Sequence, residues 1–164
     1  MNIPFRTLLK EIGVPVNGII HVGTNLGEQA RIYYDNQVNH VLWLDRNRSN
    51  LSELYNKTKQ YPLRQQYVTE IFLDKDVKDV SKTFDNFQKE NVARLPIEHY
   101  DTLIVDVDDG SEFKVLAGFE NNLRRSPAFI KRVLTKVRGT GDMGKYLSQF
   151  GFKQYGNNPA WISD

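Results

Sequence analysis

Two groups of residues in this sequence have types and spacings suited to binding a nucleotide-like cofactor. The first is a loop in which Gly23, Asn25 and Gly27 alternate directly after an apolar run, where small residues let the backbone pass close to a ligand. The second is Asp45, which ends the next apolar run 18 residues after Gly27. One carboxylate can accept hydrogen bonds from both hydroxyls of a ribose. The loop and the acid together predict a site for a nucleotide-type cofactor.

A third group of residues is acidic and follows a later apolar run. Asp106 ends that run, and Asp108, Asp109 and Glu112 come shortly after it. A calcium loop needs glycine at its sixth position and glutamate at its twelfth, but here glycine is fifth and position 117 is alanine. A magnesium ion bound by one or two of these carboxylates stays open, although the sequence favours no metal. Each group also has a plainer interpretation, since glycines make tight turns and strand-end acids cap helices.

The elements that would position these residues alternate between strands and helices. This pattern predicts an α/β fold with a mostly parallel sheet, helices on both faces and a C-terminal antiparallel hairpin. In such a sheet ligands bind beyond the carboxyl ends of the strands, where all three groups would meet. We expect strands at 18–22, 40–44, 66–73, 100–107 and 129–137, with the hairpin at 152–155 and 160–162. We expect helices at 3–12, at 28–34, after an N-cap at Ser49 (Leu51, Leu54 and Tyr55 facing inward), at 74–91, along Phe113, Leu116, Phe119 and Leu123, and at 143–150.

Composition limits the class of protein. The chain has 164 residues, 40% of them apolar and 26% charged, which predicts one domain, residues 1–164, with the N-terminal helix packed on it. It has no cysteine, which excludes disulfides and a cysteine nucleophile, and we find neither a secretory signal nor a membrane-spanning run. We therefore expect a cytoplasmic protein. The net charge is +2 and mostly dispersed, so we expect neither nucleic acid nor membrane as a partner.

The loop favours one cofactor class over another. A dinucleotide-binding Gly-x-Gly-x-x-Gly loop needs glycine at positions 25 and 28, where this chain has Asn25 and Glu28. An NAD-binding protein is therefore the weaker interpretation. The alternate-residue spacing fits the loop of S-adenosylmethionine enzymes better.

The chain resembles the FkbM-type S-adenosylmethionine-dependent methyltransferases, over about residues 18–162. The resemblance rests on residues 21–28, 41–45 and 100–120, and the last segment is its most specific part. There the family pattern reads Asp-x-x-Gly-x-Glu-x-x-Val-Leu-x-Gly. This chain has one extra spacing residue in that pattern, whose positions are filled by Asp106, Gly110, Glu112, Val115, Leu116 and Gly118.

The resemblance implies a Rossmann-like class I methyltransferase sandwich that binds S-adenosyl-L-methionine and methylates an acceptor oxygen, often on a sugar. It implies a cofactor cradle at Gly23, Asn25 and Gly27, a ribose ligand at Asp45, and Asp106 near the methyl donor. His21, where the family commonly has an acid, and Arg46, which follows the strand-end acid, belong to the expected cofactor-binding set. The expected catalytic residues are Asp106, Asp108 and Glu112, and the candidate bases for the acceptor proton are Asp106 first, then Asp108 and His21.

Some positions depart from the family pattern. Lys136 stands where the family has a glutamate near the end of the fifth strand, and the segment between the third and fourth strands is short. A binding protein that keeps the fold without turnover is therefore the main alternative. His40 and His99 lie at element boundaries and are interpreted as surface residues, and no serine lies in a Gly-x-Ser-x-Gly elbow.

Overall fold

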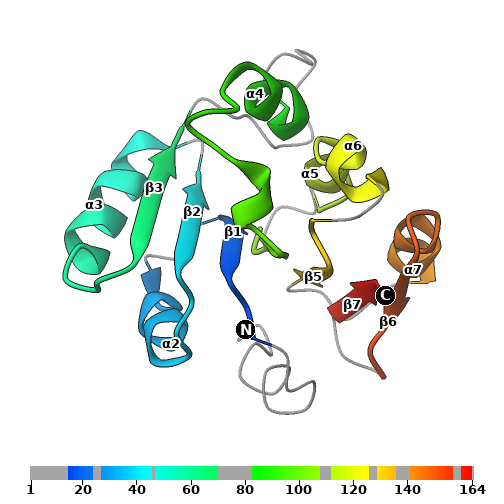
Figure 1. The fold of residues 1–164 in the computed structure, drawn as a ribbon, viewed down its shortest axis with the longest axis horizontal. Coiled ribbons are helices and arrows are strands. Elements are labelled where there is room, and N and C mark those ends of the chain that lie inside the picture. The colour runs from blue at the N-terminus through cyan, green and yellow to red at the C-terminus, as the bar shows by residue number, and fades with distance from the viewer. Residues whose placement is uncertain are drawn as a thin grey trace.

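The computed structural model describes residues 15–23, 27–45, 47–69, 83–107, 112–125, 129–135, 141–156 and 160–163. Within them the chain forms one seven-stranded sheet of order β3-β2-β1-β4-β5-β7-β6 (Figure 1). Strands β3, β2, β1, β4 and β5 are parallel neighbours, and β7 is antiparallel to both β5 and β6. The strands are β1 (Gly18–Val22), β2 (His40–Leu44), β3 (Arg64–Val68), β4 (Thr102–Val105), β5 (Arg132–Thr135), β6 (Phe152–Gln154) and β7 (Ala160–Ser163).

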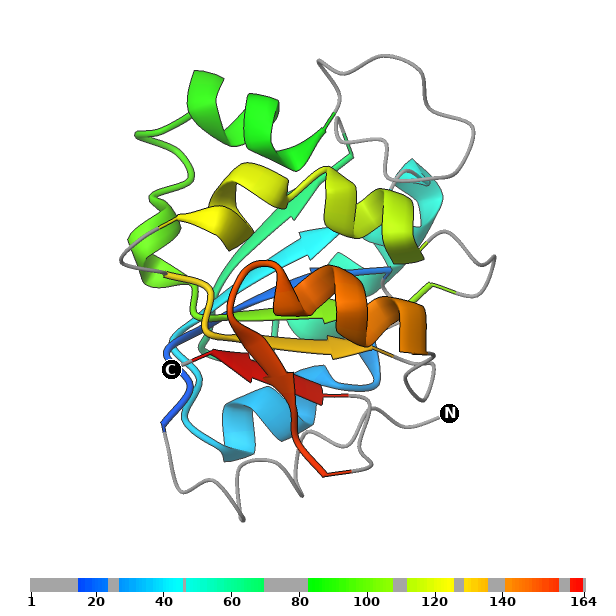
Figure 2. The same ribbon diagram turned by 90° about the vertical axis from the view of Figure 1, so that its right-hand side faces the viewer.

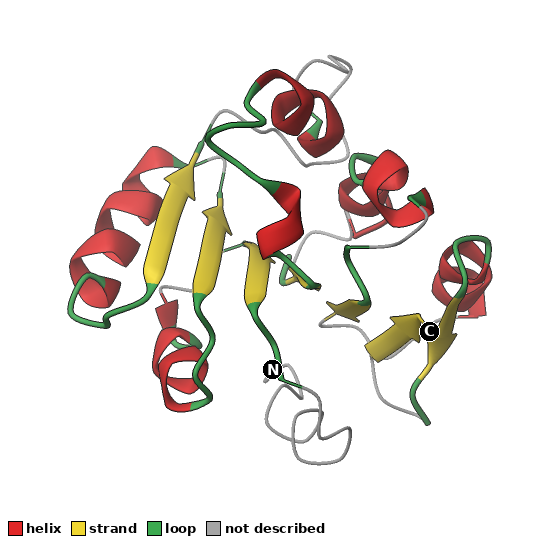
Figure 3. Ribbon diagram, viewed as in Figure 1, coloured by secondary structure: helices red, strands yellow, loops and turns green. Residues whose placement is uncertain are grey.

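Helices cover both faces of this sheet, as the red and yellow elements of Figure 3 show. In Figure 2 the green and yellow helices α4 to α6 lie above the strands and the blue α2 lies below them. The helices are α2 (Ala30–Asp35), α3 (Arg48–Thr58), α4 (Phe84–Glu90), α5 (Glu112–Ala117), α6 (Glu120–Arg124) and α7 (Gly141–Ser148), with a short 3-10 helix η3 (Ile97–His99) before β4. No helix among these described residues is long and apolar enough to span a membrane.

The core has two layers because successive side chains of a strand point to opposite faces. On β1, Ile19 packs with α2 and α3, whereas Ile20 and Val22 pack with α4 to α7. The central strands are buried on both faces, so they are continuous apolar runs. The expected α/β sandwich with helices on both faces and a C-terminal antiparallel hairpin is confirmed.

The strand bounds follow the expectation most closely at the centre of the sheet. β1 and β2 have the expected bounds, whereas β4 is shorter than expected at both ends and β5 begins three residues later than expected. The expected end of β5, at 136–137, lies outside the described residues. β3 begins at Arg64, two residues before the expected start, because the Arg64 N–H donates to the Asn39 carbonyl oxygen at 3.0 Å. The expected helix at 3–12 and the first part of the one expected at 74–91 lie outside the described residues.

The expected cap and inner face of α3 were partly wrong. Asn47 caps this helix instead of Ser49: its side-chain oxygen accepts the Ser49 N–H at 2.9 Å. The helical phase set by this cap turns Leu51 and Leu54 inward, whereas Tyr55 is 51% exposed. The Tyr55 ring lies edge-on to Tyr67, with 5.4 Å between ring centroids.

The helix expected from Phe113 to Leu123 is two helices. Asp85 of α4 causes the break, because its carboxylate accepts the backbone N–H groups of Asn121 and Asn122 and so caps α6. Burial raises the Asp85 pKa above its ordinary value, and the hydrogen bonds from Asn121 and Asn122 oppose that rise. Phe113 was expected on the inner face but is 40% exposed, since α5 turns Glu112, Val115 and Leu116 inward.

Candidate functional site

The register of the parallel strands brings three of the expected site residues to one edge of the sheet. Val22 of β1 pairs with Leu44 of β2 and with Val105 of β4. The next residues are therefore Gly23, Asp45 and Asp106, and backbone bonds continue the ladder one step further. Gly23 N–H donates to the Leu44 oxygen at 2.8 Å, and Asp106 N–H donates to the Val22 oxygen at 2.8 Å. This carboxyl edge is where an open parallel sheet binds its ligand.

Gly23 lies against the backbone of Asp106. Its φ is +84°, and a Cβ placed on it would lie 2.1 Å from the Asp106 carbonyl oxygen. A backbone carbonyl cannot move aside cheaply, so only glycine fits here. Gly27 has φ +76°, and a Cβ there would lie 2.7 Å from Leu54 Cδ1. Both glycines are required by the turn itself, and their contact with a cofactor stays a prediction.

Asp45 organises the turn that leads from β2 into α3. Its Oδ1 accepts the Asn47 N–H at 2.8 Å, and its Oδ2 accepts the Asn50 side-chain amide at 3.3 Å. The plainer expectation for a strand-end acid, that it supports the next helix, is therefore part of its role. A carboxylate has room for about four hydrogen bonds, so this local role is compatible with binding ribose hydroxyls.

A buried polar cluster lies directly beneath the edge. His21 of β1 and Tyr33 of α2 are fully buried, and the Asp106 side chain is 2% exposed. His21 Nδ1 lies 2.7 Å from the Tyr33 hydroxyl oxygen, which is a hydrogen bond. His21 Nε2 lies 3.4 Å from Asp106 Oδ2, which is longer than an ordinary hydrogen bond. The His21 ring also packs on Trp43, with 4.9 Å between ring centroids.

The electrostatics of this cluster keep the Tyr33 hydroxyl protonated. Burial, and then the charge of Asp106, raise the Tyr33 pKa well above its ordinary value. Tyr33 therefore stays a neutral hydroxyl at physiological pH and can donate to His21. A carboxylate at the edge of a largely apolar core would also favour a positively charged ligand group beside it.

Within the described part of the chain, two buried polar atoms near this edge have no hydrogen bond. They are His21 Nε2, which faces Asp106 Oδ2, and the side-chain oxygen of Gln29, the N-cap residue of α2. Leaving a buried polar atom unpaired costs about 1–3 kcal/mol, so the Gln29 oxygen fits a site that a polar ligand completes. His21 was among the expected site residues, whereas Gln29 and Tyr33 were not. Tyr33 lies within the helix expected at 28–34, and no signal in the sequence separates it from an ordinary core residue.

The remaining expected residues are only partly placed. Glu112 is buried, 8% exposed, and begins α5 just after the β4 edge. Asn25, Arg46 and Asp108 lie outside the described residues. Within the described part of the chain, no group of three or more potential ligand side chains could hold a metal ion. His40 and His99 are not isolated surface residues, since their rings stack with 4.3 Å between centroids.

The chain is similar to known proteins in its fold but not in its sequence. No protein-family model matches the chain, and no curated protein sequence matches it. Among solved structures, the chain is similar to magnesium protoporphyrin IX methyltransferase from Synechocystis PCC 6803 with bound S-adenosylmethionine. The identity is 13%, the TM-score is 0.59, and the alignment covers 97% of this chain and 76% of that one.

Two further structures show the same likeness. TrmK of M. capricolum, in complex with S-adenosyl-homocysteine, is 11% identical with a TM-score of 0.56, over 95% of this chain and 69% of that one. The N-methyltransferase NodS of Bradyrhizobium japonicum WM9 is 8% identical with a TM-score of 0.54, over 98% of this chain and 92% of that one. Together with the strand order, these likenesses show that the chain has the Rossmann-like fold of class I S-adenosylmethionine-dependent methyltransferases.

Proposed function

We propose that this protein is an S-adenosylmethionine-dependent methyltransferase whose cofactor binds at the carboxyl edge of the sheet. The observation that carries the proposal is the convergence of Gly23, Asp45 and Asp106 at the edge where ligands bind in this class of sheet. The unpartnered side-chain oxygen of Gln29 near the same edge supports it. Two of the similar solved structures hold S-adenosylmethionine or S-adenosyl-homocysteine.

The residues at this edge would contact different parts of the cofactor. Asp45 would accept hydrogen bonds from the ribose hydroxyls, and Arg46, the next residue in the sequence, would contribute to the same cofactor site. The loop with Gly23, Asn25 and Gly27 would let the cofactor approach the backbone. Asp106 and His21 would face the positively charged part of the cofactor, because a buried carboxylate attracts a cation.

The bound cofactor would supply a methyl group on a positively charged sulfur. The chain would position the acceptor oxygen, exclude water and remove the acceptor proton. Asp106 is the first candidate base. Asp108 follows it closely in sequence, and Glu112 begins α5 next to the same edge, so both could support the acceptor.

The acceptor is proposed to be a small molecule, with a sugar hydroxyl first. The support is the resemblance of residues 100–120 to FkbM-type O-methyltransferases, in which Glu112 and Gly118 keep their pattern positions. In this proposal residues 1–164 act as one cytoplasmic domain, without nucleic acid or membrane as partner.

A second candidate function is that of a binding protein without turnover. Lys136 favours it, because a lysine replaces the family's glutamate. The contact of Asp106 with His21 also favours it, because a carboxylate paired with a histidine is a weaker base than a lone one. The two candidates share the cofactor site and differ in whether a product forms.

Calorimetric titration of the purified protein with S-adenosylmethionine, S-adenosyl-homocysteine and NAD tests the shared part. We expect a dissociation constant on the order of micromolar for the first two and no binding of NAD. Asp45→Ala should weaken binding by about 10- to 100-fold, because a buried polar ligand group loses its charged partner. Asp35→Ala is the matched control, since Asp35 forms only an exposed ion pair with Arg31.

Methyl transfer to a panel of sugars and small alcohols separates the two candidates. An enzyme forms methylated product, and Asp106→Asn stops it even when the cofactor concentration is raised enough to saturate the weakened binding site of the variant. A binding protein takes up the cofactor and forms no product with any acceptor. Absence of binding by S-adenosylmethionine and by S-adenosyl-homocysteine would contradict the methyltransferase proposal itself.

A further inference from the structure

The cluster beneath the carboxyl edge is built from four separate elements. His21 comes from β1, Tyr33 from α2, Trp43 from β2, and Asp106 follows β4. The Trp43 ring packs on His21 at 4.9 Å and lies 5.9 Å from the Tyr33 ring, and its own N–H donates to Gln65 Oε1 at 2.9 Å. Packing and hydrogen bonding thus hold the His21 ring in one orientation. In it, one nitrogen faces the Tyr33 hydroxyl and the other faces the Asp106 carboxylate.

The position of the ring proton decides the electrostatics of this cluster. A neutral histidine has one nitrogen that donates and one that accepts. If Nε2 carried no proton, its lone pair would face the lone pairs of Asp106 Oδ2 at 3.4 Å, which is repulsive. If Nε2 carries the proton, it faces the carboxylate favourably, and Nδ1 is free to accept. The Tyr33 hydroxyl, 2.7 Å from Nδ1, is the group that can donate to it.

We propose that Tyr33 is a positioning residue for the cofactor site: its hydroxyl donates to His21 Nδ1, keeps the ring proton on Nε2, and so holds Asp106 as an oriented anion at the carboxyl edge. In this proposal Tyr33 acts on the ligand through His21. This inference rests on the proposed function, because the cationic sulfonium and ammonium groups of S-adenosylmethionine are what an oriented carboxylate would bind. It adds Tyr33 of α2, which lies beneath the carboxyl edge, to the residues that shape the cofactor site.

The chain's composition makes the ring proton measurable. There are only three histidines, so protein labelled with nitrogen-15 in histidine gives three imidazole patterns. Protonated and unprotonated ring nitrogens have well-separated nitrogen shifts, and a His21→Asn variant identifies the signals of His21. At neutral pH we expect His21 of the wild-type protein to be protonated on Nε2 and unprotonated on Nδ1. A proton on Nδ1, alone or together with Nε2, would overturn the proposal without any variant.

Tyr33→Phe removes the hydroxyl and keeps the ring that packs beside Trp43. We expect the His21 nitrogen pattern to lose its single tautomer, and the affinity for S-adenosylmethionine to fall about threefold to tenfold, which is the size of one net hydrogen bond. Tyr100→Phe is the matched control, because Tyr100 is also buried, 2% exposed, but precedes β4 at the opposite edge. It should change neither readout.

The readouts separate this inference from the proposed function. A wild-type protein that binds S-adenosylmethionine, with Tyr33→Phe and Tyr100→Phe binding equally well, would overturn the role of Tyr33 and leave the methyltransferase proposal standing. A wild-type protein that binds no S-adenosylmethionine would end the cofactor role of Tyr33 together with the proposed function, whatever tautomer the spectrum shows. A purely structural role predicts that Tyr33→Phe lowers stability while the His21 tautomer and the affinity stay unchanged.

Discussion

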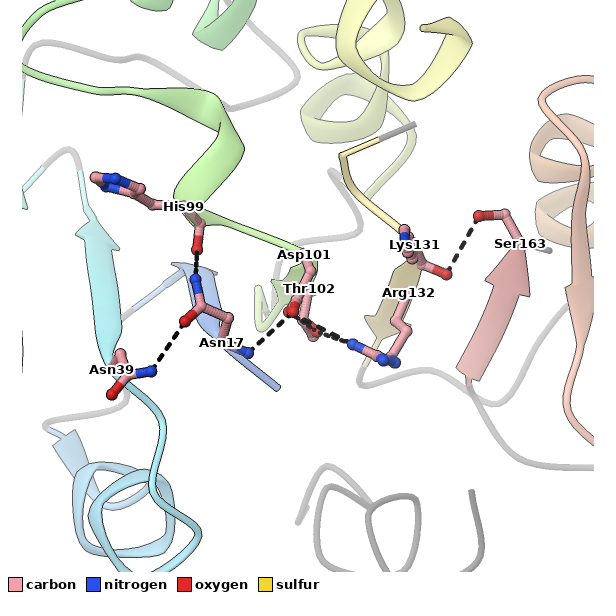
Figure 4. A network of polar contacts seen from close by, with 8 residues as sticks. All are labelled: Asn17, Asn39, His99, Asp101, Thr102, Lys131, Arg132 and Ser163. Atoms are coloured by element: carbon pink, nitrogen blue, oxygen red, sulfur yellow. Dashed lines mark hydrogen bonds and ion pairs between the residues drawn. The ribbon is translucent and has the colours of Figure 1, made fainter. Parts of the chain in front are cut away.

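The amino edge and the carboxyl edge of the sheet, where its parallel strands begin and end, differ in how far the protein satisfies the hydrogen bonds of its own polar groups. At the amino edge, Asn17 donates its backbone N–H to Asp101 Oδ2 at 2.9 Å and its side-chain amide to the His99 carbonyl oxygen at 2.9 Å (Figure 4). It accepts from the Asn39 side chain at 2.9 Å. At the carboxyl edge, Gln29 Oε1 is buried without a hydrogen-bond partner among the described residues, and His21 Nε2 lies 3.4 Å from Asp106 Oδ2.

At the amino edge the protein's own groups satisfy one another, whereas the unpartnered Gln29 oxygen at the carboxyl edge fits the proposed cofactor site. The network of the amino edge joins the beginnings of β1, β2, β4 and β5 and thus stabilises the sheet. Two further buried orphan atoms, the Tyr146 hydroxyl and Trp161 Nε1, belong to α7 and β7. Orphan atoms alone therefore do not define the site, and the convergence of Gly23, Asp45 and Asp106 at the carboxyl ends of parallel strands is the stronger argument for the carboxyl edge.

The largest expected effect is that of Gly23→Ala, which should damage the carboxyl edge. The added Cβ would meet the Asp106 carbonyl oxygen and force a residue with a side chain to hold φ +84°. We expect a loss of about 3–5 kcal/mol in the free energy of unfolding, and loss of S-adenosylmethionine binding by whatever folded protein remains. Urea denaturation and calorimetry measure the two effects.

Gly151→Ala separates backbone strain from the clash at that edge. Gly151 has φ +86°, but a Cβ there would have no neighbour within 4 Å. Its substitution should cost only about 1–2 kcal/mol, the usual cost of a left-handed conformation. Equal losses of unfolding free energy for Gly23→Ala and Gly151→Ala would show that the contact with Asp106 adds nothing to the cost of backbone strain.

Arg132→Ala should have the next largest effect, and it concerns the amino edge. Arg132 is 5% exposed and its Nη1 lies 3.4 Å from Asp101 Oδ1 and 3.4 Å from Thr102 Oγ1. Removing it leaves a partly buried carboxylate without its cation, which should cost about 2–3 kcal/mol. Affinity for S-adenosylmethionine should stay unchanged.

Arg124→Ala is the control for that variant. Arg124 pairs with Glu120 on the surface at 2.8 Å, and such exposed pairs contribute about 0.5 kcal/mol or less. The contrast between the edges would break down if Arg132→Ala weakened cofactor binding as strongly as Asp45→Ala does.

The smallest expected effect is a dependence of stability on pH at the amino edge. Burial, then the neighbouring His99 and Arg64, lower the pKa of His40. The unfolded chain then binds a proton more readily than the folded one, so stability is unaffected above about pH 7.5 and falls as the pH drops through His40's ordinary pKa of about 6.5. Urea midpoints between pH 7.5 and 5.5 would show this.

His99→Asn provides the comparison for that measurement. It removes one of the groups that lower the His40 pKa, so the fall in the urea midpoint on acidification should become shallower. A midpoint that depends on pH equally in both proteins would mean that the stacked pair does not set the dependence.

The sequence predicts the strand bounds better at the centre of the sheet than at its margins. β1 and β2 are buried on both faces, so their apolar runs mark their bounds. β3 is an edge strand that begins Arg64-Gln65-Gln66, and its polarity hides its start. The break between α5 and α6 depends on a cap from Asp85, 36 residues away from Asn121, which no local pattern contains.

The same distinction applies to the site: residues placed by local pattern could be predicted, whereas contacts made by long-range packing could not. Gly23, Asp45 and Asp106 could be predicted as neighbours because each directly follows a strand of a parallel sheet. The contact of His21 with Tyr33 joins residues 12 apart through the packing of α2 on β1, and an inward-facing tyrosine has no sequence signal for that role. The unpartnered oxygen of Gln29 can likewise be found only from burial in the folded chain.

A titration of nitrogen-15-labelled protein with S-adenosyl-homocysteine, followed by two-dimensional NMR, tests the central claim most directly. The account predicts that amide shifts concentrate at Gly23, Gly27, Asp45 and Asp106, while Asn17, Asn39 and Asp101 at the amino edge stay unchanged. Shifts that concentrate at the amino edge, or no shifts at millimolar ligand, would contradict a cofactor site at the carboxyl edge.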